Sequence, residues 1–169
     1  PSSISARVTV NARWADSSLY LDIVHAYGQP VLDVGCSTGR IVLDYLAQGL
    51  DIDGVDNSPE MLAICWDKAQ RIGLAPHLYE QWMEALALPR TYRTILVSSS
   101  SFQLVTDPDN ARAAMKRFFA HLQPGGALIM SFEFAWQDGE PTDNNWEFET
   151  RRPDDGALRA RLKALAAER

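Results

Sequence analysis

The sequence predicts an α/β protein built on a doubly wound, mostly parallel Rossmann-like sheet flanked by helices. Short apolar runs alternate along the chain with segments that carry apolar residues at helical spacing. Glycine and proline turn signals separate the two kinds of segment. With 169 residues, 46% of them apolar, the chain has the size and the apolar content of one domain with one core.

The first strand and helix flank a loop of small residues. The apolar run Val31–Val34 stops at Gly35, which predicts a strand that ends in a tight turn. Residues 41–48 carry apolar side chains at helical spacing, and Gly49 closes them, so we expect a helix there.

A second strand and helix repeat this pattern. Residues 51–55 predict the strand. Ser58 is a favourable helix cap and Pro59 a favourable first helical residue, and the apolar helical spacing then continues to Gly73. The repetition indicates a βαβ unit with a parallel sheet.

Three more strands and one helix complete the predicted core. Residues 78–81 and 94–97 predict strands, and the second of these runs is continuously apolar, as in a strand buried on both faces. A helix begins at Asp107, and the Pro-Gly-Gly turn at 124–126 leads into a strand over 127–134. In such a sheet a ligand belongs at the carboxyl ends of the strands, near the switch point of the strand order.

The two ends of the chain depart from the alternation. Apolar residues such as Tyr20 predict one N-terminal helix, and 135–153 is polar and predicts a long loop or an irregular strand. Residues 157–169 combine helix formers with leucines on one helical face, so we expect a helix and a sheet that is incomplete at its C-terminal end. The single domain 1–169 thus divides into a helical segment 1–29, a core 30–134 and a C-terminal segment 135–169.

Composition excludes several classes of protein. The formal net charge of −6 disfavours a nucleic-acid partner and an anionic membrane surface. The apolar runs fall far short of the ~20 residues that cross a bilayer, so we expect no membrane partner. Cys36 and Cys65 have no metal-ligand spacing and are too few for a disulfide framework. We expect a cytoplasmic protein without a metal site.

The loop after the first strand suits an anionic ligand group. Its residues are small, and the helix that follows offers backbone N–H groups and the positive end of its dipole. Gly35 and Gly39 lack the three-glycine pattern for a dinucleotide, and the segment has no nucleoside triphosphate motif. Asp56 ends the second strand 21 positions after Gly35, where a carboxylate accepts from ribose hydroxyls. A ligand with a ribose and a small charged group fits this pattern, as S-adenosylmethionine does.

These residues make the chain resemble a class I S-adenosylmethionine-dependent methyltransferase of the small-molecule group that shares the type 11 and type 12 methyltransferase domains. Residues 31–40 are similar to the family's first motif, with Ser37 where the middle glycine usually stands. Residues 54–62 resemble the second motif, in which the acid at Asp56 holds the ribose and Asn57 lies beside the adenine. The Gln-Pro-Gly-Gly before the last core strand is also typical of the family.

The third motif departs from the family. Trp82 stands where an aspartate usually recognises the adenine amino group, so recognition would fall to the backbone of Met83, while Trp82 either stacks on the purine or fills space. The four serines after the fourth strand are expected to line the site, with the Ser98 backbone toward the cofactor's amino group. The resemblance thus implies cofactor binding by Asp33, Gly35, Cys36, Ser37, Gly39, Asp56, Asn57, Met61, Trp82, Met83 and Ser98.

The resemblance implies an enzyme that transfers a methyl group from S-adenosylmethionine to a small-molecule acceptor by in-line displacement, a reaction that depends mainly on positioning. The sequence assigns no catalytic base, and we expect His25, His77 and His121 to be solvated or packed. Two alternatives remain: another use of the sulfonium, such as aminopropyl transfer or cofactor modification, and a non-catalytic, degenerate cofactor-binding module. A nicotinamide oxidoreductase is disfavoured by the glycine spacing. The acceptor is not specified, and a homo-oligomer is possible.

Overall fold

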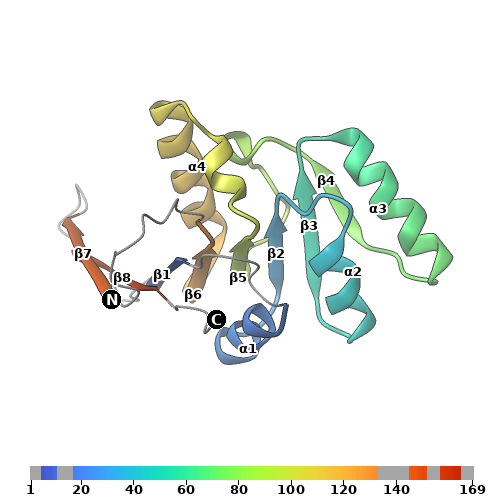
Figure 1. The fold of residues 1–169 in the computed structure, drawn as a ribbon, viewed down its shortest axis with the longest axis horizontal. Coiled ribbons are helices and arrows are strands. Elements are labelled where there is room, and N and C mark those ends of the chain that lie inside the picture. The colour runs from blue at the N-terminus through green and yellow to red at the C-terminus, as the bar shows by residue number, and fades with distance from the viewer. Residues whose placement is uncertain (1–4, 11–16, 133–144, 152–156, 165–169) are drawn as a thin grey trace, which may run out of the picture.

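The structure is a computed structural model that describes residues 5–10, 17–132, 145–151 and 157–164. Its strands form one sheet in the order β4-β3-β2-β5-β6-β1-β8-β7, and Figure 1 shows helices on both sides of the central strands. The strands are β1 (Ser5–Val10), β2 (Val31–Val34), β3 (Ile52–Asp56), β4 (His77–Glu80), β5 (Tyr92–Val97), β6 (Leu122–Met130), β7 (Asn145–Arg151) and β8 (Ala157–Ala164). The helices are α1 (Ser17–Tyr27), α2 (Arg40–Ala47), α3 (Pro59–Arg71) and α4 (Pro108–His121), with short 3-10 turns η1 (Met83–Ala85) and η2 (Ser101–Leu104).

The five central strands confirm the predicted doubly wound sheet. All four pairings among β4, β3, β2, β5 and β6 are parallel. The chain first moves outward from β2 to β4 and then returns to β5 on the other side of β2. This reversal makes the gap between β2 and β5 the switch point, where loops separate and leave room for a ligand.

Both faces of the sheet are covered because the crossovers have one hand. The crossovers through α2 and α3 advance the sheet in one direction and the crossover through α4 advances it in the other, which puts α4 on the opposite face. Neighbouring strand residues accordingly enter different cores: Val31 packs in the cluster of α1 and α2, and Leu32 in the cluster of α4. Complete burial of 31–34 explains why the run is continuously apolar apart from Asp33.

The predicted helix starts are confirmed by their caps. The Ser58 hydroxyl accepts a hydrogen bond from the Met61 amide, and Pro59 follows as the first helical residue. The Asp107 carboxylate likewise accepts from the amides of Asp109 and Asn110 at the start of α4. Both caps satisfy amides that lack a partner in the first helical turn.

The C-terminal prediction of a helix over 157–169 is wrong where the structure describes it. Residues 157–164 form β8, which pairs parallel with β1 and antiparallel with β7. Part of 135–153, predicted to be loop or irregular strand, forms β7. Strand pairing supplied by β1 and β7 overrides the helix propensity of the segment.

Two other boundaries differ from the prediction. The expected N-terminal helix is present as α1, but it is preceded by β1, which was not predicted and which pairs with β6. The last core strand begins earlier than expected, at Leu122, and ends at Met130, while 133–134 lies outside the described residues. Because β1 pairs with β6, the sheet continues beyond the last predicted strand.

Candidate active site

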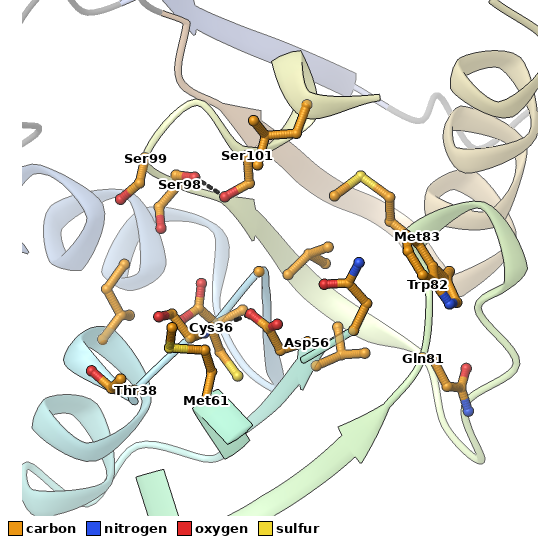
Figure 2. Close-up of a pocket in the computed structure, with 18 of the residues that line it drawn as sticks. Cys36, Thr38, Asp56, Met61, Gln81, Trp82, Met83, Ser98, Ser99 and Ser101 are labelled. Carbon is orange, nitrogen blue, oxygen red and sulfur yellow. Dashed lines mark hydrogen bonds between the residues drawn. The ribbon is translucent and has the colours of Figure 1, made fainter. Parts of the chain in front are cut away.

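A cavity of about 510 Å³ lies at the carboxyl ends of β2, β3 and β5, at the switch point (Figure 2). Every sequence-predicted site residue except Gly39 and Ser100 lines it. The residues that line it are Asp33, Val34, Gly35, Cys36, Ser37, Thr38, Arg40, Ile41, Val55, Asp56, Asn57, Met61, Gln81, Trp82, Met83, Glu84, Ser98, Ser99, Ser101, Leu104 and Val105. The fold thus gathers the three predicted motifs around one space.

The loop after β2 is held by its own backbone amides. The amides of Gly35 and Cys36 both donate to the Val55 carbonyl, at 2.8 and 3.0 Å, and the Ser37 amide donates to the Asp56 carboxylate. These three amides shape the loop and are not free for a ligand. The backbone anion site that the sequence predicts therefore cannot use them. Gly35 has a φ of +73°, and a Cβ there would lie 2.7 Å from the Ser101 hydroxyl oxygen. Only glycine lets the loop pass this close to the serine turn.

Gly39 does not line the cavity; it lies where α2 packs against α3. It precedes α2 with a φ of +83°, and a Cβ would collide with the Cys65 sulfur on α3 and lie 2.9 Å from Leu43 Cγ. The glycine therefore lets the start of α2 approach α3, and its effect on the cavity is indirect.

Asp56 is oriented by two backbone amides. Its Oδ2 accepts from the Ser37 amide at 2.8 Å and its Oδ1 from the Ser58 amide at 2.9 Å. A carboxylate offers roughly four lone-pair positions, so about two remain for a ligand. The pair of amides links the loops after β2 and β3 and fixes the carboxylate before any ligand arrives.

Asp33 is a buried acid inside the site. Its side chain is 1% exposed and its Oδ1 has no hydrogen-bond partner within the described residues. Burial raises the pKa of Asp33 to about 7, an effect that the nearby Arg40 charge opposes and the Asp56 charge reinforces. An acid with this pKa exists in both protonation states near neutral pH.

Cys36 is a small apolar wall residue. It is 4% exposed, and burial raises the pKa of its thiol above the ordinary value. The neutral thiol is neither a nucleophile nor a metal ligand at neutral pH. Across the described ranges no cluster of three metal-ligating side chains occurs.

The third-motif segment forms the opposite side of the site, with Trp82 and Met83 at the right of Figure 2 and Thr38 and Met61 at its left. Trp82 is 60% exposed at the cavity and lies immediately before η1. The Gln81 side chain exchanges hydrogen bonds with the backbone of Ala87, at 2.8 and 3.4 Å. Gln81 thus closes the loop, and the exposed Trp82 ring remains available to a ligand.

The serine turn after β5 is strained. Ser99 and Ser100 have φ values of 53° and 57°, a left-handed region that costs a non-glycine residue roughly 1 kcal/mol or more. The Ser98 carbonyl accepts from both the amide and the hydroxyl of Ser101, at 3.1 and 2.7 Å. Both lone pairs of this carbonyl are therefore used, so the expected contact of the Ser98 carbonyl with an amino group has no free acceptor in this conformation.

Several cavity residues were not singled out from the sequence. Arg40 belongs to the first motif, but the sequence assigned it no role. Its guanidinium lies 3.4 Å from the Ser99 hydroxyl. Leu104 and Val105 reach the cavity from η2 and the residue after it. Leu104 and Val105 could be found only from the structure, because nothing in the neighbouring sequence distinguishes them. Arg40 could have been identified from the sequence, as a basic residue at the start of a helix beside a ligand loop.

The three histidines lie outside the cavity. His121 is buried, with Nδ1 2.8 Å from the Arg117 carbonyl and Nε2 accepting from the Leu88 amide. His77 is exposed and lies beside Asp53, and His25 is exposed on α1. None of the three borders the site.

Three comparisons relate the chain to known proteins. A family model described as a methyltransferase domain matches residues 31–126. The chain is 30% identical over 123 residues to a carboxy-S-adenosyl-L-methionine synthase of Enterobacter sp. (strain 638), covering 66% of this chain and 46% of that protein. It is 26% identical over 123 residues to a putative methyltransferase of Geobacillus sp. (strain WCH70), covering 69% and 50%. The chain spans about half the length of these relatives.

Solved structures share the fold. An S-adenosylmethionine-dependent methyltransferase from Clostridium acetobutylicum has a TM-score of 0.62 at 22% identity, covering 81% of this chain and 56% of that one. The glycopeptide N-methyltransferase MtfA complexed with S-adenosyl-L-methionine has a TM-score of 0.61 at 22% identity, covering 90% and 79%. These likenesses confirm the fold class. No helix in the described segments is both long and apolar enough to span a bilayer.

Proposed function

We propose that this chain, which belongs to the methyltransferase domain family, binds S-adenosylmethionine and transfers its methyl group to a small-molecule acceptor. The observation that carries the proposal is Asp56, a carboxylate fixed by two amides at the end of β3 and facing the switch-point cavity. A pre-oriented acceptor pair of this kind suits the two hydroxyls of a ribose.

The residues present fit this cofactor. The cavity of about 510 Å³ falls in the range of roughly 300–1,000 Å³ that small-molecule sites occupy. Asp56 would hold the ribose, Trp82 would stack on the purine, and Asn57 and Met61 would border the nucleoside. The unpartnered Oδ1 of Asp33 is an acceptor for the ammonium group of the amino-acid tail.

When bound, the cofactor would supply a methyl group activated by its sulfonium. The chain's own residues would orient the ligand and keep water away from the reacting centre. The walls formed by Val34, Ile41 and Leu104 are apolar and suit that role. A base is needed only for an acceptor that carries a proton, and no side chain of the cavity is assigned to it.

A small acceptor agrees with the charge and with the names of similar proteins. The net charge of −6 opposes binding to nucleic acid. Structural neighbours include a sugar N-methyltransferase and a glycopeptide N-methyltransferase. The relatives named carboxy-S-adenosyl-L-methionine synthase favour a second candidate, in which the chain modifies the cofactor itself. Mass analysis of the nucleoside after incubation separates the two, because methyl transfer yields S-adenosylhomocysteine.

The test is isothermal titration with S-adenosylmethionine, S-adenosylhomocysteine, NAD and ATP. We expect only the sulfur nucleosides to bind and Asp56→Ala to weaken them about a hundredfold, the loss of two hydrogen bonds to a charged acceptor. Asp67→Ala, which removes an exposed carboxylate on α3 outside the cavity, is the matched control and keeps wild-type affinity. Absence of binding by the folded wild-type chain would refute the cofactor proposal, and binding without turnover of any acceptor would favour the non-catalytic alternative.

A further inference from the structure

One end of the cavity holds two opposite charges. Asp33 lines the cavity from β2, and Arg40, the first residue of α2, lines it as well. Among the cavity-lining residues that the structure describes, Arg40 alone is a cation, while Asp33, Asp56 and Glu84 are acids. The positive charge is therefore a local exception in an acidic site.

These two charges do not satisfy each other. The ion pairs within the described residues do not include Asp33 with Arg40, although the Arg40 charge is near enough to oppose the rise of the Asp33 pKa. Asp33 Oδ1 is buried and unpartnered. Toward the residues that the structure describes, the Arg40 guanidinium donates one long hydrogen bond of 3.4 Å, to the neutral Ser99 hydroxyl. Each group thus retains hydrogen-bonding capacity toward the cavity.

Asp33, with one unpartnered carboxylate oxygen, and Arg40, without an ion pair among the described residues, line the same cavity and together complement a zwitterion. The carboxylate suits an ammonium group, and the guanidinium fork suits a carboxylate, which it can bind through two parallel bonds. A free α-amino acid group carries both charges on one carbon. The amino-acid tail of the proposed cofactor brings this group to the end of the cavity away from the purine.

We propose that Arg40 is the specificity-determining residue that holds the α-carboxylate of this tail, so that the site selects a carboxylated sulfur nucleoside over its decarboxylated form. The inference rests on the proposed function, since it assumes a sulfur nucleoside in the cavity. Arg40 reaches the carboxylate from α2 while the strained serine turn supports the guanidinium from the other side, through Ser99.

This selection separates two uses of the cofactor. Transfer of an aminopropyl group requires a tail that has already lost its carboxylate, because the transferred chain ends in an amine alone. A site that requires the carboxylate rejects that donor. Methyl transfer and modification of the methyl group both leave the tail intact, so both remain compatible with Arg40.

The test compares three ligands by isothermal titration: S-adenosylhomocysteine, its decarboxylated analogue, which keeps the ammonium, and 5′-methylthioadenosine, which lacks the whole charged tail. The wild type should prefer S-adenosylhomocysteine over the decarboxylated analogue by about tenfold. Arg40→Gln should lose about tenfold in affinity for S-adenosylhomocysteine, keep its affinity for the other two ligands and so abolish the preference. Arg40→Lys should keep part of the preference, because it keeps the charge without the fork. Arg71→Gln, an exposed arginine on α3 outside the cavity, is the matched control and should behave as wild type.

The outcomes separate the two proposals. Binding of none of the three ligands by the wild type would refute the proposed function and this inference with it. Wild-type binding with an Arg40→Gln loss that is equal for all three ligands would overturn the inference alone, because the arginine would then act on the fold of the site. No loss for any ligand would also overturn it, since the carboxylate would be held elsewhere.

Discussion

Asp33 makes the stability of this protein depend on pH in a direction that the structure fixes. Burial raises the pKa of Asp33 from 3.8 to about 7. The unfolded chain therefore releases this proton at lower pH than the folded chain does. From this group alone, stability is greatest below the unfolded pKa and falls as the pH rises, until the folded carboxyl is also ionised above about pH 7.

The size of the effect follows from the shift. Full ionisation of the folded Asp33 costs about 4 kcal/mol relative to the unfolded chain, at about 1.4 kcal/mol for each unit of pKa. Between about pH 5 and about pH 8, about 2–3 kcal/mol of this cost appears. Asp33→Asn removes the titrating group, so the variant should lack this decline.

The measurement is urea unfolding of wild type and Asp33→Asn at both pH values. Other carboxyl groups also titrate, so the quantity to compare is the difference between the two pH dependences, which isolates Asp33. Asp44→Asn, which removes an exposed carboxyl from α2, controls for the change in net charge. If wild type and Asp33→Asn lose the same stability between the two pH values, Asp33 is either paired or hydrated in solution and the reasoning fails.

Three further substitutions test the packing around the site. Ser37→Gly should stabilise the protein by about 0.5–1 kcal/mol, because residue 37 has a φ of +50°; thermal unfolding measures it, and a destabilised variant would argue against strain there. Gly54→Ala should destabilise by about 1–3 kcal/mol in urea, because its Cβ would lie 2.8 Å from the Leu78 side chain and 2.9 Å from the Cys36 sulfur; an unchanged midpoint would show that these side chains can move aside at no cost. His121→Leu should lower the free energy of unfolding in urea by about 1–3 kcal/mol, because the half-buried Leu88 amide loses its acceptor; an unchanged free energy would mean that water replaces the imidazole.

The centre of the sheet was predictable because the buried runs 31–34 and 94–97 are short and nearly continuously apolar. Val31–Val34 is buried at every position, so its pattern states both its conformation and its place in the middle of the sheet. The helix starts were predictable for a local reason as well, since Ser58 and Asp107 cap the amides of their own first turns. Features fixed within a few residues of sequence are visible in the sequence.

The cavity was predictable only in part, since its chemistry depends on groups brought together by the sheet. Asp56 was identified from its position, but the two amides that orient it come from separate loops. The Ser98 carbonyl already accepts two hydrogen bonds because of the strained turn, and a run of four serines does not predict that turn. The position of Arg40 at the start of a helix beside the ligand loop was visible in the sequence, but the unpartnered Asp33 oxygen that gives it a role was not. The Ser37–Asp56 contact joins two loops 19 positions apart in sequence, and the other two relations depend on the conformation of a loop, which residue spacing does not encode.

The C-terminal strand shows why a local pattern can support the wrong element. Leu158 and Leu162 are four positions apart, a spacing that places residues on one face of a helix and equally on one face of a strand. The intervening residues alternate between alanine and basic side chains, which is a period-two pattern whose apolar signal is weak because alanine is small. Helix propensity then favours a helix, whereas pairing decides for a strand: β8 places Leu162 opposite Val8 of β1 and opposite Trp146 of β7. The deciding partner, β1, lies more than a hundred residues earlier in the chain, so no window around the segment could have contained it.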